Sequence, residues 1–226
     1  MVFHGAVRKS QQGGGIRAAA RRRKGLCAAR LVEPLLLRLD ISRRLIFGPW
    51  IVSVSKHQAL GKRRVRIHPE RNECWRIGIG EIAGKPVMLA QPQTFMNLSG
   101  TSVKPLMEKH ELTPTDLVAV WDELNLPWGG LKIMQQGSAG GHNGAESLIG
   151  SLGTREFVRV RLGVHPGRPL ASGMDYLLAP VKRSQKQEWE ELIGRGAEAV
   201  ATIISEGAAK AMTKFNRRAQ GSNEEE

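Results

Sequence analysis

Apolar residues follow two alternating periods in the last two thirds of the chain, and this pattern constrains the fold most strongly. In "EFVRVRLGV", Arg159 and Arg161 alternate with apolar residues, which predicts a strand with one buried face. The apolar residues of that strand are Val158, Val160, Leu162 and Val164. Farther on, apolar residues recur at helical spacing and predict a helix between a Ser184 cap and Gly207. They are Trp189, Leu192, Ile193, Val200, Ile203 and Ile204.

Other strands and helices alternate between residue 74 and this helix. "KPVMLAQP" and "DLVAVWDE" are short apolar runs typical of strands, and the second ends in acidic residues. Between them, "LSGTSVKPLMEKH" has apolar residues at helical spacing, with Ser99 or Thr101 as the N-cap. This order predicts a single α/β domain with a mostly parallel sheet flanked by helices.

The net charge of +13 on the 226 residues is confined to the first third of the chain. Residues 1–73 contain 17 Lys+Arg and 4 Asp+Glu, whereas the remaining residues contain 17 of each kind. We interpret residues 1–73 as a basic, aperiodic segment: a transit-like segment, a disordered arm, or the product of a misassigned start or reading frame. The predicted domain comprises residues 74–218, and residues 219–226 form an acidic tail.

Composition argues against several classes of protein. Because no run approaches about 18 consecutive apolar residues, we expect no membrane-spanning segment. Cys27 and Cys74 lack the spacing of a disulfide framework or a zinc site, so we expect no metal and a reducing compartment. A cytoplasmic location follows, or a mitochondrial or plastid one if residues 1–32 are a transit segment.

The run "GIGEIAG" satisfies the G-x-G-x-x-A pattern of dinucleotide-binding proteins. That pattern needs a helix to follow it, and Pro86, two residues after Gly84, would end a helix there. We therefore interpret the run as a hairpin turn and expect no cofactor.

A glycine-rich run, "GSAGGHNGAESLIGSLG", precedes a helical pattern. Asn143 and Glu146 have the spacing of a capping box, and Gly153 would close the helix. A cap alone does not explain the glycines before it, which are typical of a mobile lid over a ligand. The run lacks the lysine of a phosphate-binding loop.

Two further stretches carry polar residues suited to a binding site. In "WDELNLPWGG", Asp122 follows an apolar strand, where it could orient a histidine, bind a cation or cap a turn, and we expect Glu123 on the surface. In "QPQTFMNLSG", Phe95 could stack on a base or sugar and Asn97 could bind a carbonyl or ribose hydroxyl. Alternatively, Phe95 belongs to the core and Asn97 caps a helix.

Together and in order, these stretches and the closing "DYLLAP" and "AMTKFN" resemble the bacterial-type peptidyl-tRNA hydrolase family. The match runs from about Cys74 to Arg218. The resemblance implies one α/β domain, usually monomeric and without a metal. It also implies cleavage of the ester between a peptide and the 3′ ribose of tRNA, so that peptidyl-tRNA is the expected partner.

The resemblance also implies roles for five residues. Asp122 would orient the base histidine, and Asn97 would hold the substrate near the ester, with Phe95 at the 3′ end. Asn143 would bind the substrate from the lid, and His142 would support it without being the general base.

The family's first segment, which carries the base histidine, is not recognisable in this chain. His57 and His68 are the nearest histidines, and neither has the expected Arg-His-Asn context. We therefore expect a sheet that lacks an inner strand. A catalytically silent RNA-binding offshoot of the same fold is the alternative to an enzyme, with the basic segment contacting phosphates.

Overall fold

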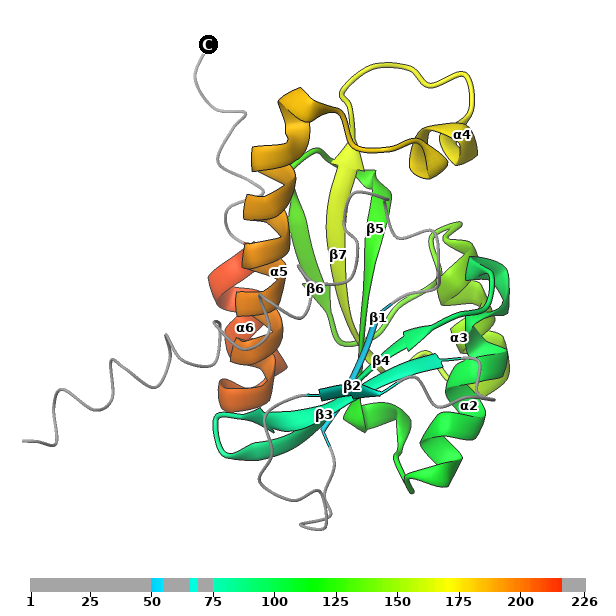
Figure 1. Ribbon diagram of the computed structural model, residues 1–226, viewed down its shortest axis with the longest axis vertical. Coiled ribbons are helices and arrows are strands. Elements are labelled where there is room, and N and C mark those ends of the chain that lie inside the picture. Colours follow the sequence, from blue (N-terminus) through cyan, green and yellow to red (C-terminus); the bar gives the residue numbers. More distant parts are fainter. Residues whose placement is uncertain (1–49, 55–65, 69–74, 217–226) are drawn as a thin grey trace, which may run out of the picture.

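The structure is a computed structural model that describes residues 50–54, 66–68 and 75–216 as one sheet with helices (Figure 1). The strands are β1 (Trp50–Val54), β2 (Arg66–His68), β3 (Trp75–Ile82), β4 (Lys85–Pro92), β5 (Leu117–Pro127), β6 (Leu131–Met134) and β7 (Val158–His165). The α-helices are α2 (Ser99–Lys109), α3 (Asn143–Leu152), α4 (Gly173–Leu178), α5 (Lys186–Glu206) and α6 (Ala208–Phe215). Short 3-10 helices are η1 (Met96–Leu98), η2 (Pro114–Asp116) and η3 (Arg183–Gln185).

The seven strands lie in the order β2-β3-β4-β1-β5-β7-β6. Among these described strands, β5 and β7 form the one parallel pair, and the other neighbours are antiparallel. The predicted α/β fold is thus confirmed, but the prediction of a mostly parallel sheet is wrong. Short turns such as the one between β3 and β4 allow only antiparallel pairing, whereas α3 provides the crossover that a parallel pair needs.

The inner position of the sheet between β4 and β5 is occupied by β1. This strand pairs antiparallel with both neighbours, with Val52 opposite Leu89 on one side and Val118 on the other. The expectation of a sheet without an inner strand is therefore wrong.

The sheet separates two apolar layers. Helices α5 and α6 cover one face and α2 and α3 cover the other, as Figure 1 shows. Along β5 the side chains alternate between them: Val118 and Val120 face α5, whereas Ala119 and Trp121 face α2 and α3. This alternation decides which layer each polar residue of β5 enters.

The predicted apolar stripe of α5 is confirmed, because all six of its residues are buried. The helix ends at Gly207, whose φ of 94° favours glycine. Its start was predicted wrongly: Gln185 is the N-cap, and Ser184 belongs to η3. The cap of α2 was also predicted wrongly, since Leu98 takes that position and Ser99 is already helical.

The run "GIGEIAG" forms the β3–β4 hairpin, which confirms the predicted turn and excludes the dinucleotide site. Ala83 and Gly84 make the turn with φ of 52° and 79°. Two successive residues with positive φ match the right-handed twist of the paired strands.

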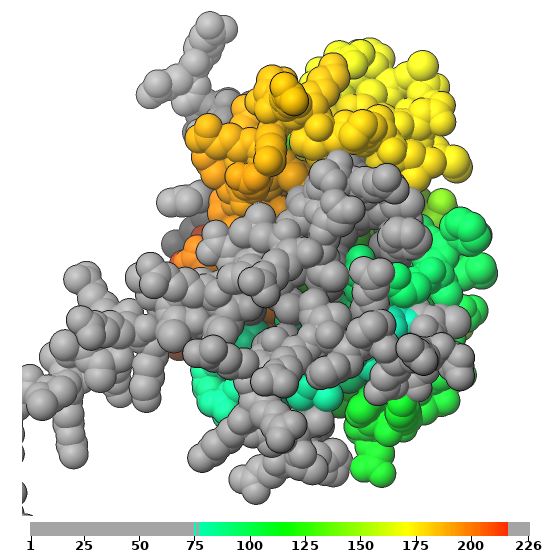
Figure 2. Space-filling view, in the orientation of Figure 1, coloured from blue at the N-terminus to red at the C-terminus, as the bar shows by residue number. Residues whose placement is uncertain are grey.

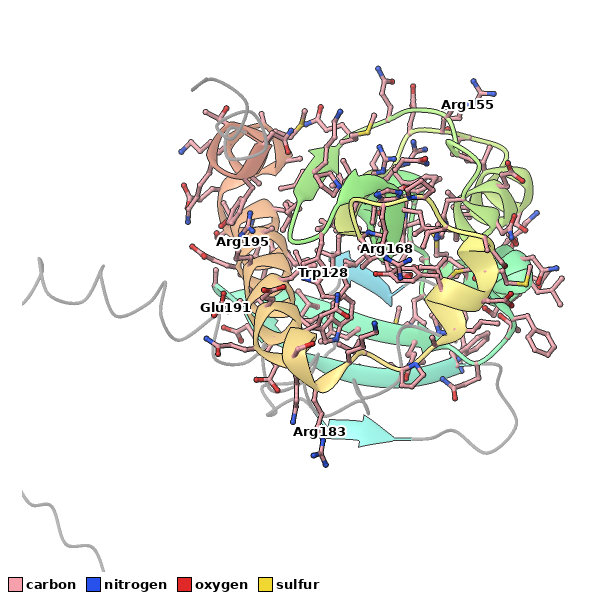
Figure 3. All side chains as sticks on the ribbon, turned by 90° about the horizontal axis from the view of Figure 1, so that it is seen from above. Trp128, Arg155, Arg168, Arg183, Glu191 and Arg195 are labelled. Carbon is pink, nitrogen blue, oxygen red and sulfur yellow. The ribbon has the colours of Figure 1, made fainter. Side chains whose placement is uncertain are left out.

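Helix α5 is fixed to the turn after β5. Arg195 donates from Nη1 to the carbonyl of Gly129 at 2.8 Å, and the rings of Trp128 and Trp189 lie 6.0 Å apart. Trp128 and Arg195 are labelled in Figure 3. Figure 2 shows the yellow segment around α4 beside the orange start of α5 at one end of the molecule.

The end of α6 is attached to strand β6. The Asn216 side chain accepts a hydrogen bond from the Ile133 amide at 2.8 Å and donates one to the Ile133 carbonyl at 3.0 Å. The Asn216 side chain thus binds both the backbone amide and the backbone carbonyl of Ile133, which lies on the edge strand β6.

Candidate active site

Asp122 lies in the middle of β5, where only 2% of its surface is exposed. It was expected at the end of the strand, but β5 continues to Pro127 with an irregular register between Glu123 and Pro127. Asp122 alternates with Trp121 and therefore belongs to the α5 side of the sheet. The structure thus places this acid deep in the fold, where an ionised carboxylate needs a partner.

Glu123 was expected on the surface, and that prediction is wrong because its exposed fraction is 2%. Its carboxylate accepts hydrogen bonds from Arg161 Nε at 2.8 Å, the Asn125 amide at 3.0 Å and Trp121 Nε1 at 3.3 Å. Burial opposes ionisation, but these hydrogen bonds and the Arg161 charge outweigh it and hold the pKa of Glu123 below its ordinary value. Glu123 is therefore an ionised carboxylate inside the α2–α3 layer.

His142 caps helix α3 at its first turn. Its Nδ1 accepts a hydrogen bond from the Ala145 amide at 3.1 Å, and its ring stacks on Trp121 with centroids 5.0 Å apart. Burial lowers the pKa of His142 to about 4; it outweighs the nearby Glu123 charge, which raises the pKa, and the Arg161 charge adds a smaller lowering effect. The imidazole is thus neutral at pH 7, with Nδ1 as an acceptor.

The predicted cap at Asn143 is wrong by one residue. Asn143 is the first residue of α3, and its exposed side chain is not needed to cap the helix. The predicted close of α3 at Gly153 is confirmed, with φ of 69°.

The loop with Phe95 and Asn97 lies against the start of α3. Both side chains are exposed, Phe95 by 75%, so its assignment to the core is wrong. The adjoining Met96 approaches so closely that a Cβ on Gly144 would lie 2.6 Å from its Sδ. The structure therefore brings the segments of Asn97 and Asn143 together, although 46 residues separate them in sequence.

The helices behind these two segments are also in close contact. The Gly100 amide of α2 donates to Ser147 Oγ of α3 at 2.9 Å. A Cβ at Gly100 would collide with the Ser147 carbonyl, so only glycine allows this approach. The relative position of the two loops is thus set by backbone packing.

The glycine-rich loop before α3 is connected to the sheet at two carbonyls. Asn125 Nδ2 donates to Gly140 O at 3.0 Å, and Arg159 Nη1 donates to Ser138 O at 3.1 Å. Gly140 and Gly141 have φ of 61° and 79°, which other residues rarely adopt.

Sequence reasoning missed Trp121, Glu123, Asn125 and the two arginines of β7 as parts of this site. The signal was available, because Trp121, Glu123 and Asn125 have the period-2 spacing of one strand face. Arg161 lies opposite Trp121 in the parallel β5–β7 pair.

The base histidine is not identified within the described residues. His57 lies outside them, and for His68 the structure describes only the backbone, on the edge strand β2. Four strand spacings separate β2 from β5, or roughly 19 Å. This distance argues against His68 as the partner of Asp122.

The described residues form neither a metal-binding cluster nor a membrane-spanning helix. No group of three or more His, Cys, Asp or Glu side chains there could hold a metal ion. None of the helices in the described ranges has the length and apolar character needed to cross a membrane.

Comparison with known proteins gives consistent results. A family profile described as peptidyl-tRNA hydrolase matches residues 56–224. The peptidyl-tRNA hydrolase of Solibacter usitatus is 61% identical over 150 residues, which cover 66% of this chain and 76% of that protein. The Bacillus subtilis peptidyl-tRNA hydrolase is 40% identical over 144 residues, covering 62% of this chain and 75% of that protein.

Solved structures agree at the level of the fold. The crystal structure of peptidyl-tRNA hydrolase from Acinetobacter baumannii superimposes with a TM-score of 0.62 at 24% identity, over 67% of this chain and 77% of that one. The family profile covers well over half of the chain, and the relatives match across most of their own lengths. The chain therefore belongs to the peptidyl-tRNA hydrolase family.

Proposed function

We propose that this protein hydrolyses the ester bond between peptide and tRNA, with Asp122, Asn97 and Asn143 in its catalytic machinery. The observation that supports the two asparagine roles is the contact between two distant segments, each with an exposed asparagine, where Met96 approaches Gly144. The role of Asp122 rests on the family. The proposed activity is that of the relatives in the family. The exposed side chains of Asn97 and Asn143 offer polar groups suited to binding a polar substrate.

The chemistry of ester hydrolysis assigns a task to each group. A base must take a proton from water while donors stabilise the oxyanion that forms on the ester carbonyl. The amides of Asn97 and Asn143 are suited to holding the substrate near the ester, and exposed Phe95 offers a ring for the 3′ end of the tRNA. Asp122 would orient the base histidine and favour the tautomer that accepts the proton.

His142 supports the site without serving as the base. A base works best with a pKa near the working pH, and a pKa of about 4 makes His142 a weak proton acceptor at pH 7. Its Nδ1 is also engaged by Ala145. These properties favour a structural role beside Asn143.

The protein would act as a monomer in the cytoplasm on peptidyl-tRNA. The bacterial origin of the relatives supports the cytoplasmic location in this proposal. The end of the domain at residue 218 is likewise a proposal, whereas β1 and β2 extend the sheet to residues before the expected start at 74.

Peptide release from an N-acetylated aminoacyl-tRNA tests the proposed function. We expect Asp122→Asn to lower kcat by about two orders of magnitude or more, because the amide cannot orient a histidine as an anion does. Glu190→Gln, an exposed change on α5, is the matched control and should keep wild-type activity. Wild-type protein that releases no more peptide than a heat-inactivated sample would refute the proposal.

A further inference from the structure

A buried tryptophan connects the polar network under the glycine-rich loop with the cap of α3. Trp121 is 1% exposed, and its indole plane lies at 22° to the imidazole of His142 with centroids 5.0 Å apart. On its other side, Trp121 Nε1 donates to Glu123 Oε2 at 3.3 Å. The hydrogen bond to Glu123 therefore fixes the rotation of the indole, and the stacking contact fixes the ring of His142.

Glu123 is itself held in a single orientation. Its Oε2 accepts from both Trp121 and Arg161, and its Oε1 accepts from the Asn125 amide. A carboxylate with donors on both oxygens cannot rotate without losing hydrogen bonds in a buried place. The position of the indole is therefore defined by β5 and β7 and not by apolar packing alone.

The His142 ring connects these fixed side chains to the two segments that carry Asn143 and Asn97. Its Nδ1 fixes the first turn of α3, and Asn143 is the next residue. A Cβ on Gly144 would lie 3.0 Å from His142 Cε1 and 2.6 Å from Met96 Sδ, so the imidazole, the helix start and the Asn97 segment are in contact. A rotated imidazole would disturb both asparagine-bearing segments.

We propose that Trp121 and Glu123 are positioning residues for the hydrolysis: they hold the His142 ring in the orientation that places Asn143 and Asn97 for substrate binding. This inference rests on the proposed substrate-binding role of the two asparagines. The competing explanation is that Trp121 only fills the core, in which case any residue of similar bulk elsewhere in the core should matter equally.

The experiment uses the full chain with Trp121→Leu, Trp121→Phe and Glu123→Gln. Trp189→Leu is the matched control, because Trp189 is equally buried but lies in the α5 layer on the opposite face. Three quantities are measured: kcat and KM for an N-acetylated aminoacyl-tRNA, Kd for an analogue whose ester is replaced by an amide, and the NMR titration of the His142 ring.

We expect Trp121→Leu to raise KM and the analogue Kd about tenfold, with kcat changed less than twofold. Trp121→Phe keeps an aromatic face and should restore most of the affinity, and Glu123→Gln should raise KM about threefold. Trp189→Leu should leave KM within twofold. The His142 titration, near pH 4 in the wild type, should move toward 6.5 in Trp121→Leu only.

The outcomes separate this inference from the proposed function. If Trp121→Leu leaves both KM and the His142 titration at their wild-type values, the positioning role is wrong, even if Asn143→Ala weakens binding. If Asn143→Ala and Asn97→Ala leave analogue binding unchanged, the proposed substrate-binding role of the two asparagines is wrong. In that case, Trp121→Leu still tests whether the stacking of Trp121 on His142 affects substrate binding. Should Trp121→Leu not fold, Glu123→Gln decides through KM and the analogue Kd: unchanged values of both would reject the positioning role.

Discussion

At the scale of single residues, Asn97 and Asn143 carry the proposed contacts with the substrate. Both side chains are exposed, and each offers a donor and an acceptor. Because neither is needed for the fold described above, their removal should change binding more than stability.

We expect Asn143→Ala and Asn97→Ala each to raise KM by three- to tenfold, the equivalent of one lost hydrogen bond of about 1 kcal/mol. Steady-state peptide release measures this effect, and thermal unfolding should change by no more than a few degrees. Asn125→Ala provides a comparison, since its side chain binds Gly140 of the glycine-rich loop. Unchanged KM in both variants would remove these asparagines from the site.

Residue-scale predictions from the sequence succeeded for exposed loops and failed for buried polar groups. The exposure of Phe95 and Asn97 agrees with one of the two interpretations offered by their polar neighbours. Glu123 could not be assigned in the same way, because its burial depends on Arg161, 38 residues farther along the chain. An acidic residue is ordinarily exposed unless such a partner exists, and sequence periodicity does not identify the partner.

At the scale of secondary-structure elements, the start of α3 against η1 decides the geometry of the site. The two elements meet at Gly144, where a side chain would enter the space of Met96 and His142. A small change here therefore acts on both asparagine-bearing segments at once.

We expect Gly144→Ala to destabilise the protein by about 1–3 kcal/mol through overpacking, despite the better helix propensity of alanine. Gly150→Ala lies in the same helix with open space around it and should instead stabilise by about 0.5–1 kcal/mol. Urea unfolding of both variants measures the difference. Equal effects of the two substitutions would contradict the close contact at Gly144.

At the scale of the whole molecule, acid should weaken the fold through His142. Its pKa in the folded state is about 4, below the ordinary 6.5, so the unfolded chain binds a proton first as the pH falls. The stability is complete above pH 6.5 and is lost progressively toward pH 4, by up to about 3 kcal/mol. The lowered pKa of Glu123 acts in the same direction at still lower pH.

Urea unfolding at several values between pH 7 and pH 4 measures this loss. His142→Asn keeps an acceptor at the cap position but no group that titrates in this range. The variant should therefore show a smaller loss of stability between pH 6.5 and pH 4. If wild type and variant lose stability in parallel, His142 does not carry the effect.

The sequence predicted the class of the fold better than the direction of its strands. Periodicity located β4, β5, β7 and α5 because burial of one face requires it. Strand direction depends on which strands become neighbours, and β1 and β6 pair with strands far away in sequence. Which strands become neighbours depends on contacts across the whole sheet, and the periodicity of a single segment does not reveal it.

The attachment of Asn216 to Ile133 has a consequence for behaviour at high concentration. Strand β6 is the last strand on one side of the sheet, and exposed backbone groups on such a strand can recruit another chain. The Asn216 amide occupies both groups of Ile133 as a further strand would. The residue that follows α6 thus shields this part of the edge strand from pairing with another chain.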